Sequence, residues 1–180
     1  KILNGVSLTG DYSLKTKDEV LSYGELISGK YVTAALNAKG IKATLLDSRE
    51  LIKTDDSFSN AEVDEGLSKE NVIRYFHNLE TGTIPVVTGF IASNKEGVTT
   101  TLGRNGTNYS AALLANFLDA GELINYTHVD GIFTANPDLV QDAKVIDVIS
   151  YSEANELANF GANILHAKTI IPLIEKNIPL

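Results

Sequence analysis

The feature that most restricts the fold of this chain is a repeated alternation of strand-like and helix-like segments. Residues 18–39 carry apolar side chains at nearly helical spacing, and Gly40 is suited to end a helix. Residues 41–46 predict a short strand, and residues 68–79 predict a second helix with Ser68 as its N-cap. Residues 83–91 are apolar and β-branched on both faces, which is typical of a buried parallel strand with Pro85 near its beginning.

The alternation continues through the second half of the chain. A Thr- and Gly-rich loop, residues 98–108, precedes a predicted helix at 109–118, a strand at 122–127 and a turn-rich loop at 130–137. Helices are expected at 150–160, opened by Ser150 and Glu153 as a capping box, and at 167–176, which contains Pro172. This pattern predicts one α/β domain with a mainly parallel sheet, in which ligands bind beyond the carboxyl ends of the strands.

Composition excludes several classes of protein. The net charge of −8 disfavours nucleic acid and anionic membranes as partners. No apolar run approaches the roughly 20 residues that span a bilayer. The absence of cysteine excludes a disulfide scaffold and a thiolate metal site, and it fits a reducing cytoplasm. The three histidines form no recognisable cluster, so no protein-held metal is expected.

The most informative segment is residues 99–110, Thr-Thr-Thr-Leu-Gly-Arg-Asn-Gly-Thr-Asn-Tyr-Ser. Gly103 and Gly106 allow backbone N–H groups to come close to a ligand. Thr107 or Asn108 can cap the following helix, whose N-terminus presents partial positive charge. Arg104 adds a guanidinium that can hold a carboxylate through two parallel hydrogen bonds. These residues predict an anion site, although a turn with a surface arginine fits them equally well.

The same segment resembles the aspartokinase motif T-T-L-G-R-x-G-[ST]-D-[YF]-[ST]-A-A, and five other segments resemble further motifs of that family in the family's order. These are Ser22-Tyr-Gly-Glu-Leu26, Leu46-Asp-Ser-Arg-Glu50, Val87-Thr-Gly-Phe-Ile91, residues 126–137 and residues 160–166. The resemblance implies the amino-acid kinase fold, a three-layer α/β/α sandwich. It also implies a phosphotransferase that moves the γ-phosphoryl group of ATP to the β-carboxylate of L-aspartate. The product, 4-phospho-L-aspartate, leads to lysine, threonine and methionine.

The resemblance further implies a role for individual residues. Arg104 and Asn108 are expected at the catalytic centre, with Arg104 binding a substrate carboxylate. Glu25 is expected to receive the substrate ammonium group, and Phe90 to line the aspartate pocket. The other expected substrate-site positions are Thr101, Gly106 and Thr107. The expected nucleotide-site positions are Thr127, His128, Gly131, Phe133 and Asn163. MgATP is the implied co-substrate, with Mg²⁺ carried by the nucleotide, in a cytoplasmic and homo-oligomeric parent protein.

Four positions depart from the family motifs. Asn108 and His128 each replace an aspartate, Asp138 replaces an arginine, and Asn163 replaces a lysine. An asparagine at the place of Asn163 is also found in bifunctional aspartokinase–homoserine dehydrogenases. The segment Arg104-Asn105-Gly106 resembles the corresponding segment of those enzymes as well. Two alternatives stay open, and Asn108, His128 and Asp138 favour the second of them. One is another kinase of the same fold, acting on glutamate, acetylglutamate, carbamate or a nucleotide, and the other is a non-catalytic binding module.

Nothing in the 180 residues resembles the family's first strand, K-F-G-G-T-S, whose lysine bridges the phosphates. Residues 1–180 are therefore expected to form the greater part of a catalytic domain, with that strand and the regulatory domains outside them. Phosphoryl transfer depends on positioning and charge neutralisation, so the isolated piece is expected to show little or no turnover.

Overall fold

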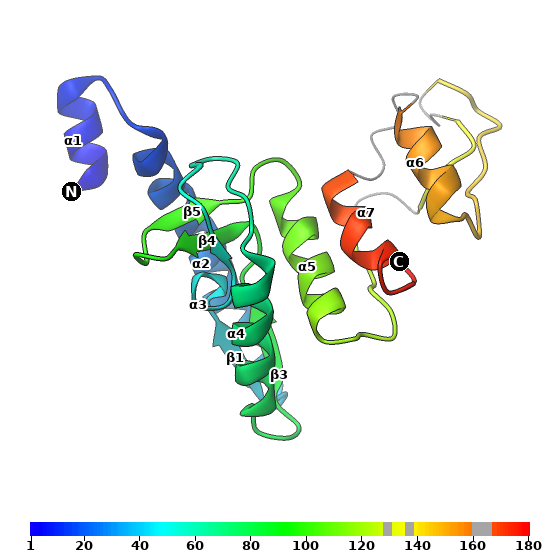
Figure 1. The fold of residues 1–180 in the computed structure, drawn as a ribbon, viewed down its shortest axis with the longest axis horizontal. Helices are drawn as coiled ribbons and strands as arrows, with labels where there is room; N and C mark the ends of the chain where they lie inside the picture. Colours follow the sequence, from blue (N-terminus) through cyan, green and yellow to red (C-terminus); the bar gives the residue numbers. More distant parts are fainter. Residues whose placement is uncertain (128–130, 136–138, 160–166) are drawn as a thin grey trace.

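The computed structural model describes residues 1–127, 131–135, 139–159 and 167–180 (Figure 1). Its elements in chain order are α1 (Ile2–Thr9), α2 (Leu14–Ala38), β1 (Ala43–Leu46), α3 (Ser48–Leu51), β2 (Lys53–Thr54), α4 (Glu65–His77), β3 (Ile84–Val87), β4 (Ile91–Asn94), β5 (Thr99–Thr101), α5 (Gly106–Phe117), α6 (Tyr151–Asn159) and α7 (Ala167–Ile174). Within these described ranges, no helix has the length and apolar character needed to cross a membrane.

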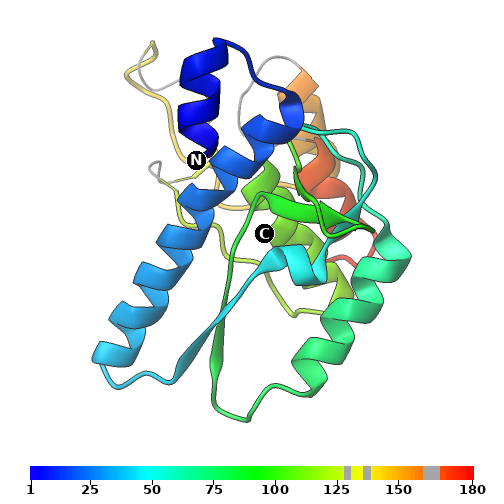
Figure 2. The same cartoon turned by 90° about the vertical axis from the view of Figure 1, so that its left-hand side faces the viewer.

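Strands β1 and β3 form the centre of a three-layer arrangement. They pair in parallel, with Leu46 opposite Val87. Leu45 lies against Gly29 of α2, whereas Leu46 joins a buried cluster that includes Val72 of α4. Because successive side chains of a strand point to opposite faces, α2 and α4 cover opposite faces of this pair (Figure 2). The predicted α/β/α sandwich is therefore confirmed.

A second, mixed sheet has the order β2–β4–β5. Strand β2 pairs with β4 in parallel, and β4 pairs with β5 in antiparallel register, with Ile91 opposite Thr101. The predicted single strand at 83–91 was wrong, because it is divided into β3 and β4 by a tight turn in which Ile91 N–H donates to Gly89 C=O at 2.7 Å. The predicted loop at 98–108 was also too long, since β5 occupies its first part.

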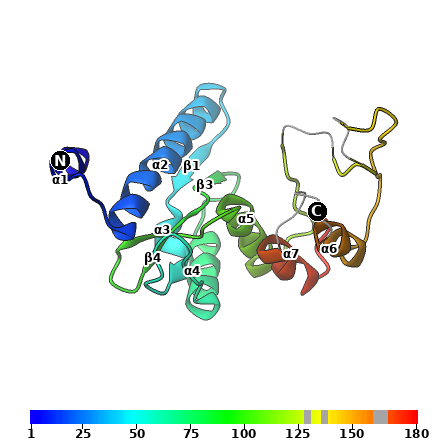
Figure 3. The same ribbon diagram turned by 90° about the horizontal axis from the view of Figure 1, so that it is seen from above.

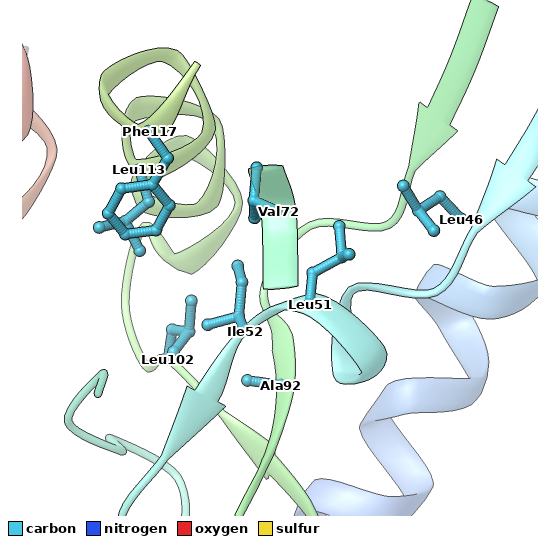
Figure 4. Close-up of a cluster of buried hydrophobic side chains, with 8 residues drawn as sticks. All are labelled: Leu46, Leu51, Ile52, Val72, Ala92, Leu102, Leu113 and Phe117. Carbon is cyan, nitrogen blue, oxygen red and sulfur yellow. The ribbon is translucent and has the colours of Figure 1, made fainter. Parts of the chain in front are cut away.

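The main hydrophobic core lies where the second sheet, α4 and α5 meet (Figure 4). Its buried members are Leu46, Leu51, Ile52, Val72, Ala92, Leu102, Leu113 and Phe117. Helix α5 has a second buried face, on which Ala112 and Ala115 pack against Leu173 of α7. Figures 1 and 3 show α5 between α4 and α7. Burial on both sides fixes the position of α5 and of its N-terminus.

Several predicted helix ends were wrong. Asp64, not Ser68, is the N-cap of α4, and the Ser68 hydroxyl lies inside the helix, where it accepts the Lys53 N–H at 2.9 Å. Helix α5 begins at Gly106 with Asn105 as N-cap, so neither Thr107 nor Asn108 caps it. The capping box of Ser150 and Glu153 at the start of α6 is confirmed by reciprocal hydrogen bonds.

Two further predictions about the fold need correction. Residues 122–127 form no strand in the structure, although Leu123 N–H donates to Pro179 C=O at 2.8 Å. Helix α2 exists as predicted but starts at Leu14, and its apolar residues Ile27 and Tyr31 are 66% and 76% exposed. The buried residues of α2 are Asp18, Ser22 and Gly29. Helix α1 has no buried residue and stands apart from the sheets (Figure 3).

Candidate active site

The candidate site lies at the carboxyl ends of β1 and β3, as predicted for a parallel α/β sheet. The residues that follow these two strands, Ser48 and Thr88, are joined by hydrogen bonds. Ser48 N–H donates to the Thr88 hydroxyl at 2.9 Å, and the two hydroxyl groups are 3.0 Å apart. The Ser48 hydroxyl also donates to Ile91 C=O at 2.5 Å. These bonds hold the turn from residue 88 to residue 90 in a fixed place.

This turn packs directly against the N-terminus of α5. A Cβ atom added to Gly89 would lie 2.6 Å from Thr107 Cγ2, so only a residue without a side chain fits there. Phe90 packs on Gly106 in the same way, and its N–H donates to the Ser110 hydroxyl at 3.0 Å. Phe90 has φ 67°, a strained conformation for a non-glycine residue, and such strain is concentrated at functional sites.

The first turn of α5 offers unpaired backbone donors. Asn105 is the N-cap with φ 58°, and its side chain makes no capping hydrogen bond. Among the described residues, the N–H groups of Thr107 and Asn108 have no hydrogen-bond partner. Free N–H groups at a helix N-terminus carry partial positive charge and attract anions. The predicted anion-binding character of this segment therefore has a structural basis.

Two arginines lie near this end of the sheets, and only one is available. Arg49 binds Asp47, with Nη2 2.6 Å from Oδ2, and also donates to Thr99 Oγ1 at 3.1 Å. Burial alone would raise the pKa of Asp47, but the hydrogen bonds and charge of Arg49 outweigh it, so the pKa is lowered. Arg104 is exposed and has no ion pair within the part of the chain that the structure describes. Arg104 directly precedes Asn105, the N-cap of α5.

Glu25 approaches the site from α2. Partial burial raises the pKa of its carboxyl group, and a hydrogen bond from the Gly89 N–H offsets part of that rise. Since Gly89 contacts Thr107, the Glu25 carboxylate and the N-terminus of α5 flank the same turn. Glu25 has no ion pair among the described residues, and a half-buried carboxylate of this kind is suited to receive an ammonium group.

The structure adds supporting residues that the sequence analysis missed. Asp18 is fully buried and accepts hydrogen bonds from Ser59 and Thr101. Thr101 was expected to bind substrate, but it is 1% exposed and both of its donors go to Asp18, so direct contact with substrate is not supported. Gly103, at φ 76°, would place a Cβ 2.6 Å from Asn60 Oδ1. No local pattern pointed to Asp18, because the apolar residues of α2, such as Ile27 and Tyr31, lie on another face of the helix, which is exposed.

A second cation lies close to the same loop. Lys168, in the first turn of α7, donates from Nζ to Asn60 Oδ1 at 2.9 Å. Because Asn60 contacts Gly103, one residue separates this ammonium group from the loop that carries Arg104. The sequence analysis did not select Lys168, since nothing in its local pattern distinguishes it from other surface lysines.

The expected nucleotide-site residues are only partly described. Thr127 is exposed, and Phe133 is half-buried and forms an isolated bridge with Val145. Gly131 also contacts the Val145 side chain. His128, Asp138 and Asn163 lie outside the described residues. In the described ranges, no group of three or more His, Asp or Glu side chains could hold a metal ion.

One cavity in the described part lies away from these residues. It has a volume of about 690 Å³ and lies between the beginnings of β1 and β3 and the end of α4. Lys42, Arg74, Glu80 and Thr83 are among its lining residues, and Lys42 and Glu80 form an ion pair there. None of the predicted site residues that the structure describes lines this cavity.

Comparison with known proteins supports the resemblance seen in the motifs. The chain matches the profile of the amino acid kinase family over residues 6–180. It is 40% identical over 164 residues to lysine-sensitive aspartokinase 3 of Escherichia coli (strain K12), covering 91% of this chain and 36% of that protein. It is 35% identical to the chloroplastic bifunctional aspartokinase/homoserine dehydrogenase 1 of Zea mays, covering 99% of this chain and 20% of that protein.

Solved structures agree. The crystal structure of E. coli aspartokinase III in complex with aspartate and ADP superposes with a TM-score of 0.87 at 36% identity, covering 98% of this chain and 41% of that one. Aspartate kinase from Synechocystis gives a TM-score of 0.77 at 28% identity, over 98% of this chain and 28% of that one. The chain thus spans well under half the length of these relatives. The predicted fold and family are confirmed, and the chain belongs to the amino acid kinase family.

Proposed function

We propose that the protein transfers the γ-phosphoryl group of ATP to the β-carboxylate of L-aspartate and so forms 4-phospho-L-aspartate. The observation that carries this proposal is a pair of opposed charges around one turn. Arg104 and the free N–H groups of Thr107 and Asn108 form the positive side, and the Glu25 carboxylate forms the negative side. The names of the matched relatives, and the aspartate and ADP bound to E. coli aspartokinase III, support the same reaction.

The arrangement fits an amino acid with a second carboxylate. The planar guanidinium of Arg104 and the start of α5 can hold one carboxylate of aspartate, and Glu25 can hold its ammonium group. The other carboxylate is then left to face the nucleotide. The turn at Gly89 and Phe90 lies between the two charged sides, because it packs against the start of α5.

We place the nucleotide near residues 127–133, with Thr127, His128, Gly131, Phe133 and Asn163 as its expected contacts. Phosphoryl transfer needs positioning and neutralisation of charge more than covalent chemistry. Mg²⁺ carried by ATP would neutralise part of the phosphate charge, and Lys168 is a further cation close to the loop. Asn108, at the first turn of α5, stands where the resembled motif has an aspartate and is proposed to orient the reacting groups.

The proposal extends to the whole protein in which this chain occurs. That protein is expected to contain a phosphate-binding strand and regulatory domains outside residues 1–180. Its homo-oligomeric state and cytoplasmic location stay predictions, and several matched plant relatives are named chloroplastic enzymes.

Trapping of the acyl phosphate with hydroxylamine tests the reaction directly. The protein as it is naturally made is incubated with MgATP, hydroxylamine and L-aspartate, and aspartyl hydroxamate is measured. Parallel reactions contain glutamate, acetylglutamate, carbamate or a nucleoside monophosphate, with ADP release as the readout. Hydroxamate that depends on both ATP and aspartate supports the proposal. Turnover only with another acceptor, or binding of both ligands by calorimetry without turnover, refutes it.

A further inference from the structure

Asp18 is a buried carboxylate that the proposed reaction does not use. It lies in the second turn of α2 and has no exposed surface. Its Oδ1 atom accepts the hydroxyl groups of Ser59 and Thr101, each at 2.9 Å. Its Oδ2 atom accepts the N–H groups of the same two residues, at 2.7 and 2.9 Å. No Lys, Arg or His forms an ion pair with it within the described ranges.

Both partners of Asp18 lie next to the loop that carries Arg104, residues 102–105. Thr101 is the last residue of β5 and stands three residues before Arg104. Ser59 has φ 68°, and its C=O, together with the Asn60 side chain, lies against Gly103. The four hydrogen bonds of Asp18 therefore support the Arg104 loop from two sides.

Asp18 also belongs to the helix that carries the opposite charge of the site. Glu25 lies about two turns further along α2. Because a helix transmits a displacement along its axis as a rigid element, a shift of α2 at Asp18 moves Glu25 with it. Asp18 is the residue at which α2 is bound to the end of β5, and so it connects the two charged sides.

We propose that Asp18 is a positioning residue that sets the separation of Glu25 and Arg104 and thereby the recognition of the amino-acid substrate. This inference rests on the proposed function and adds a residue to its recognition site. Replacing a residue that only stabilised the fold would affect binding of the amino acid and binding of the nucleotide alike. A positioning residue for this site affects binding of the amino acid far more than binding of the nucleotide.

The side-chain chemistry defines an informative pair of variants. Asp18→Ala leaves two N–H groups and two hydroxyl groups without their acceptor, and α2 is released from β5. Asp18→Asn has nearly the same shape. Its carbonyl oxygen can replace Oδ2, and its NH₂ group can replace Oδ1 because the hydroxyl groups of Ser59 and Thr101 can rotate to accept. Asp18→Asn is therefore expected to rescue much of the function lost in Asp18→Ala.

The test is steady-state kinetics of the protein as it is naturally made, well below its melting temperature. For Asp18→Ala we expect KM for aspartate to rise by about 10-fold or more, because a shift of Glu25 relative to Arg104 weakens charge-assisted hydrogen bonds to the amino acid, and the loss of one such bond changes affinity by about that factor. KM for ATP is expected to change by less than about 3-fold, and Asp18→Asn to stay within about 3-fold of wild type for both substrates.

Thr54→Val is the matched control. Thr54 and Thr100 form an equally buried hydroxyl pair at 2.7 Å between β2 and β5, and this pair does not involve α2. The control is expected to lower the melting temperature and to leave both KM values near wild type. If Thr54→Val and Asp18→Ala change the two KM values alike, or if Asp18→Ala lowers only kcat, the proposal is overturned.

Two further measures keep the test decisive. If Asp18→Ala does not fold, Ser59→Ala removes one of the four bonds, and an unchanged KM for the amino acid would then overturn the proposal. If wild type phosphorylates an amino acid other than aspartate, the same comparison is made with that amino acid. An error in the proposed substrate is thereby separated from an error about Asp18.

Discussion

Replacing Gly89 with alanine tests whether the turn at residues 88–90 positions the start of α5. The added Cβ would lie 2.6 Å from Thr107 Cγ2, 3.0 Å from its Cα and 3.1 Å from its Cβ. Rotation of the threonine side chain cannot relieve the contact with its Cα, so backbone must move. The closest pair must separate by about 0.8 Å, the difference between 2.6 Å and the 3.4 Å at which ordinary contact begins. Gly89 has no positive φ, so the clash, not backbone strain, is what the substitution adds.

The displaced N-terminus of α5 carries the free N–H groups that we propose to bind the substrate carboxylate. A movement of this size is expected to lower kcat/KM for aspartate by about 10- to 100-fold. Overpacking of this kind is also expected to lower the free energy of unfolding by about 1–3 kcal/mol. Both quantities are measured on the protein as it is naturally made, the first by a coupled assay of ADP release and the second by urea unfolding.

Gly66→Ala provides a matched control. Gly66 lies in α4, away from the site, and a Cβ there would meet only Asp64 Oδ1 at 3.8 Å. This variant is expected to gain up to about 1 kcal/mol of stability from helix propensity and to keep wild-type kinetics. Wild-type kinetics in Gly89→Ala would refute the reasoning, even if stability fell, because the start of α5 would then not contribute to substrate binding.

The remaining predictions concern charge and the extent of the chain. Arg104→Lys is expected to raise KM for aspartate about 10-fold, since an ammonium group cannot form two parallel bonds. It is expected to change the unfolding free energy by less than about 0.5 kcal/mol, because Arg104 is exposed and has no ion pair among the described residues; a clear loss of stability in urea unfolding would contradict this. For Glu25, burial raises the pKa of the carboxyl group above its unfolded value, so its ionised form destabilises the fold as pH rises through that pKa. Glu25→Gln is therefore expected to be slightly more stable than wild type at pH 8 and to lose this advantage as pH falls below the carboxyl pKa. It is also expected to bind aspartate more weakly. Unfolding curves measured at pH 8 and below the carboxyl pKa test the stability, and no gain at pH 8 would contradict this prediction. Residues 1–180 alone are expected to yield little or no aspartyl hydroxamate, and ATP-dependent hydroxamate from that piece would contradict the proposal that a phosphate-binding strand outside these residues is needed.

Local features around the candidate site could be predicted from the sequence. Glycines, a guanidinium and a helix start within residues 99–110 predicted an anion site. Among the residues that the structure describes, the N–H groups of Thr107 and Asn108 have no hydrogen-bond partner and Arg104 has no ion pair. The capping box at Ser150 was found for the same reason, since its partners are three residues apart. Such features can be predicted from residue types a few positions apart, because the backbone between them forms a single turn.

Other features depend on residues that are far apart in the chain. Thr101 and Asp18 are separated by 83 positions, and Ser59 and Asp18 by 41, so no local pattern relates them. The break between β3 and β4 is a similar case, because the apolar run at 83–91 is continuous in sequence. It is divided by the packing of Gly89 and Phe90 against α5, which periodicity cannot show.

By itself the sequence determined the α/β class and the loop that carries Arg104, because hydrophobic spacing and turn chemistry act within a few residues. The family followed from the resemblance of its motifs. Only the tertiary structure decided which face of α2 is buried, where α5 begins and which carboxylate supports the loop. Those outcomes depend on close packing between distant segments, where a fraction of an ångström decides which residue fits. The buried face of α2 carries Asp18, Ser22 and Gly29, and it is defined by what β5 and β1 present to it.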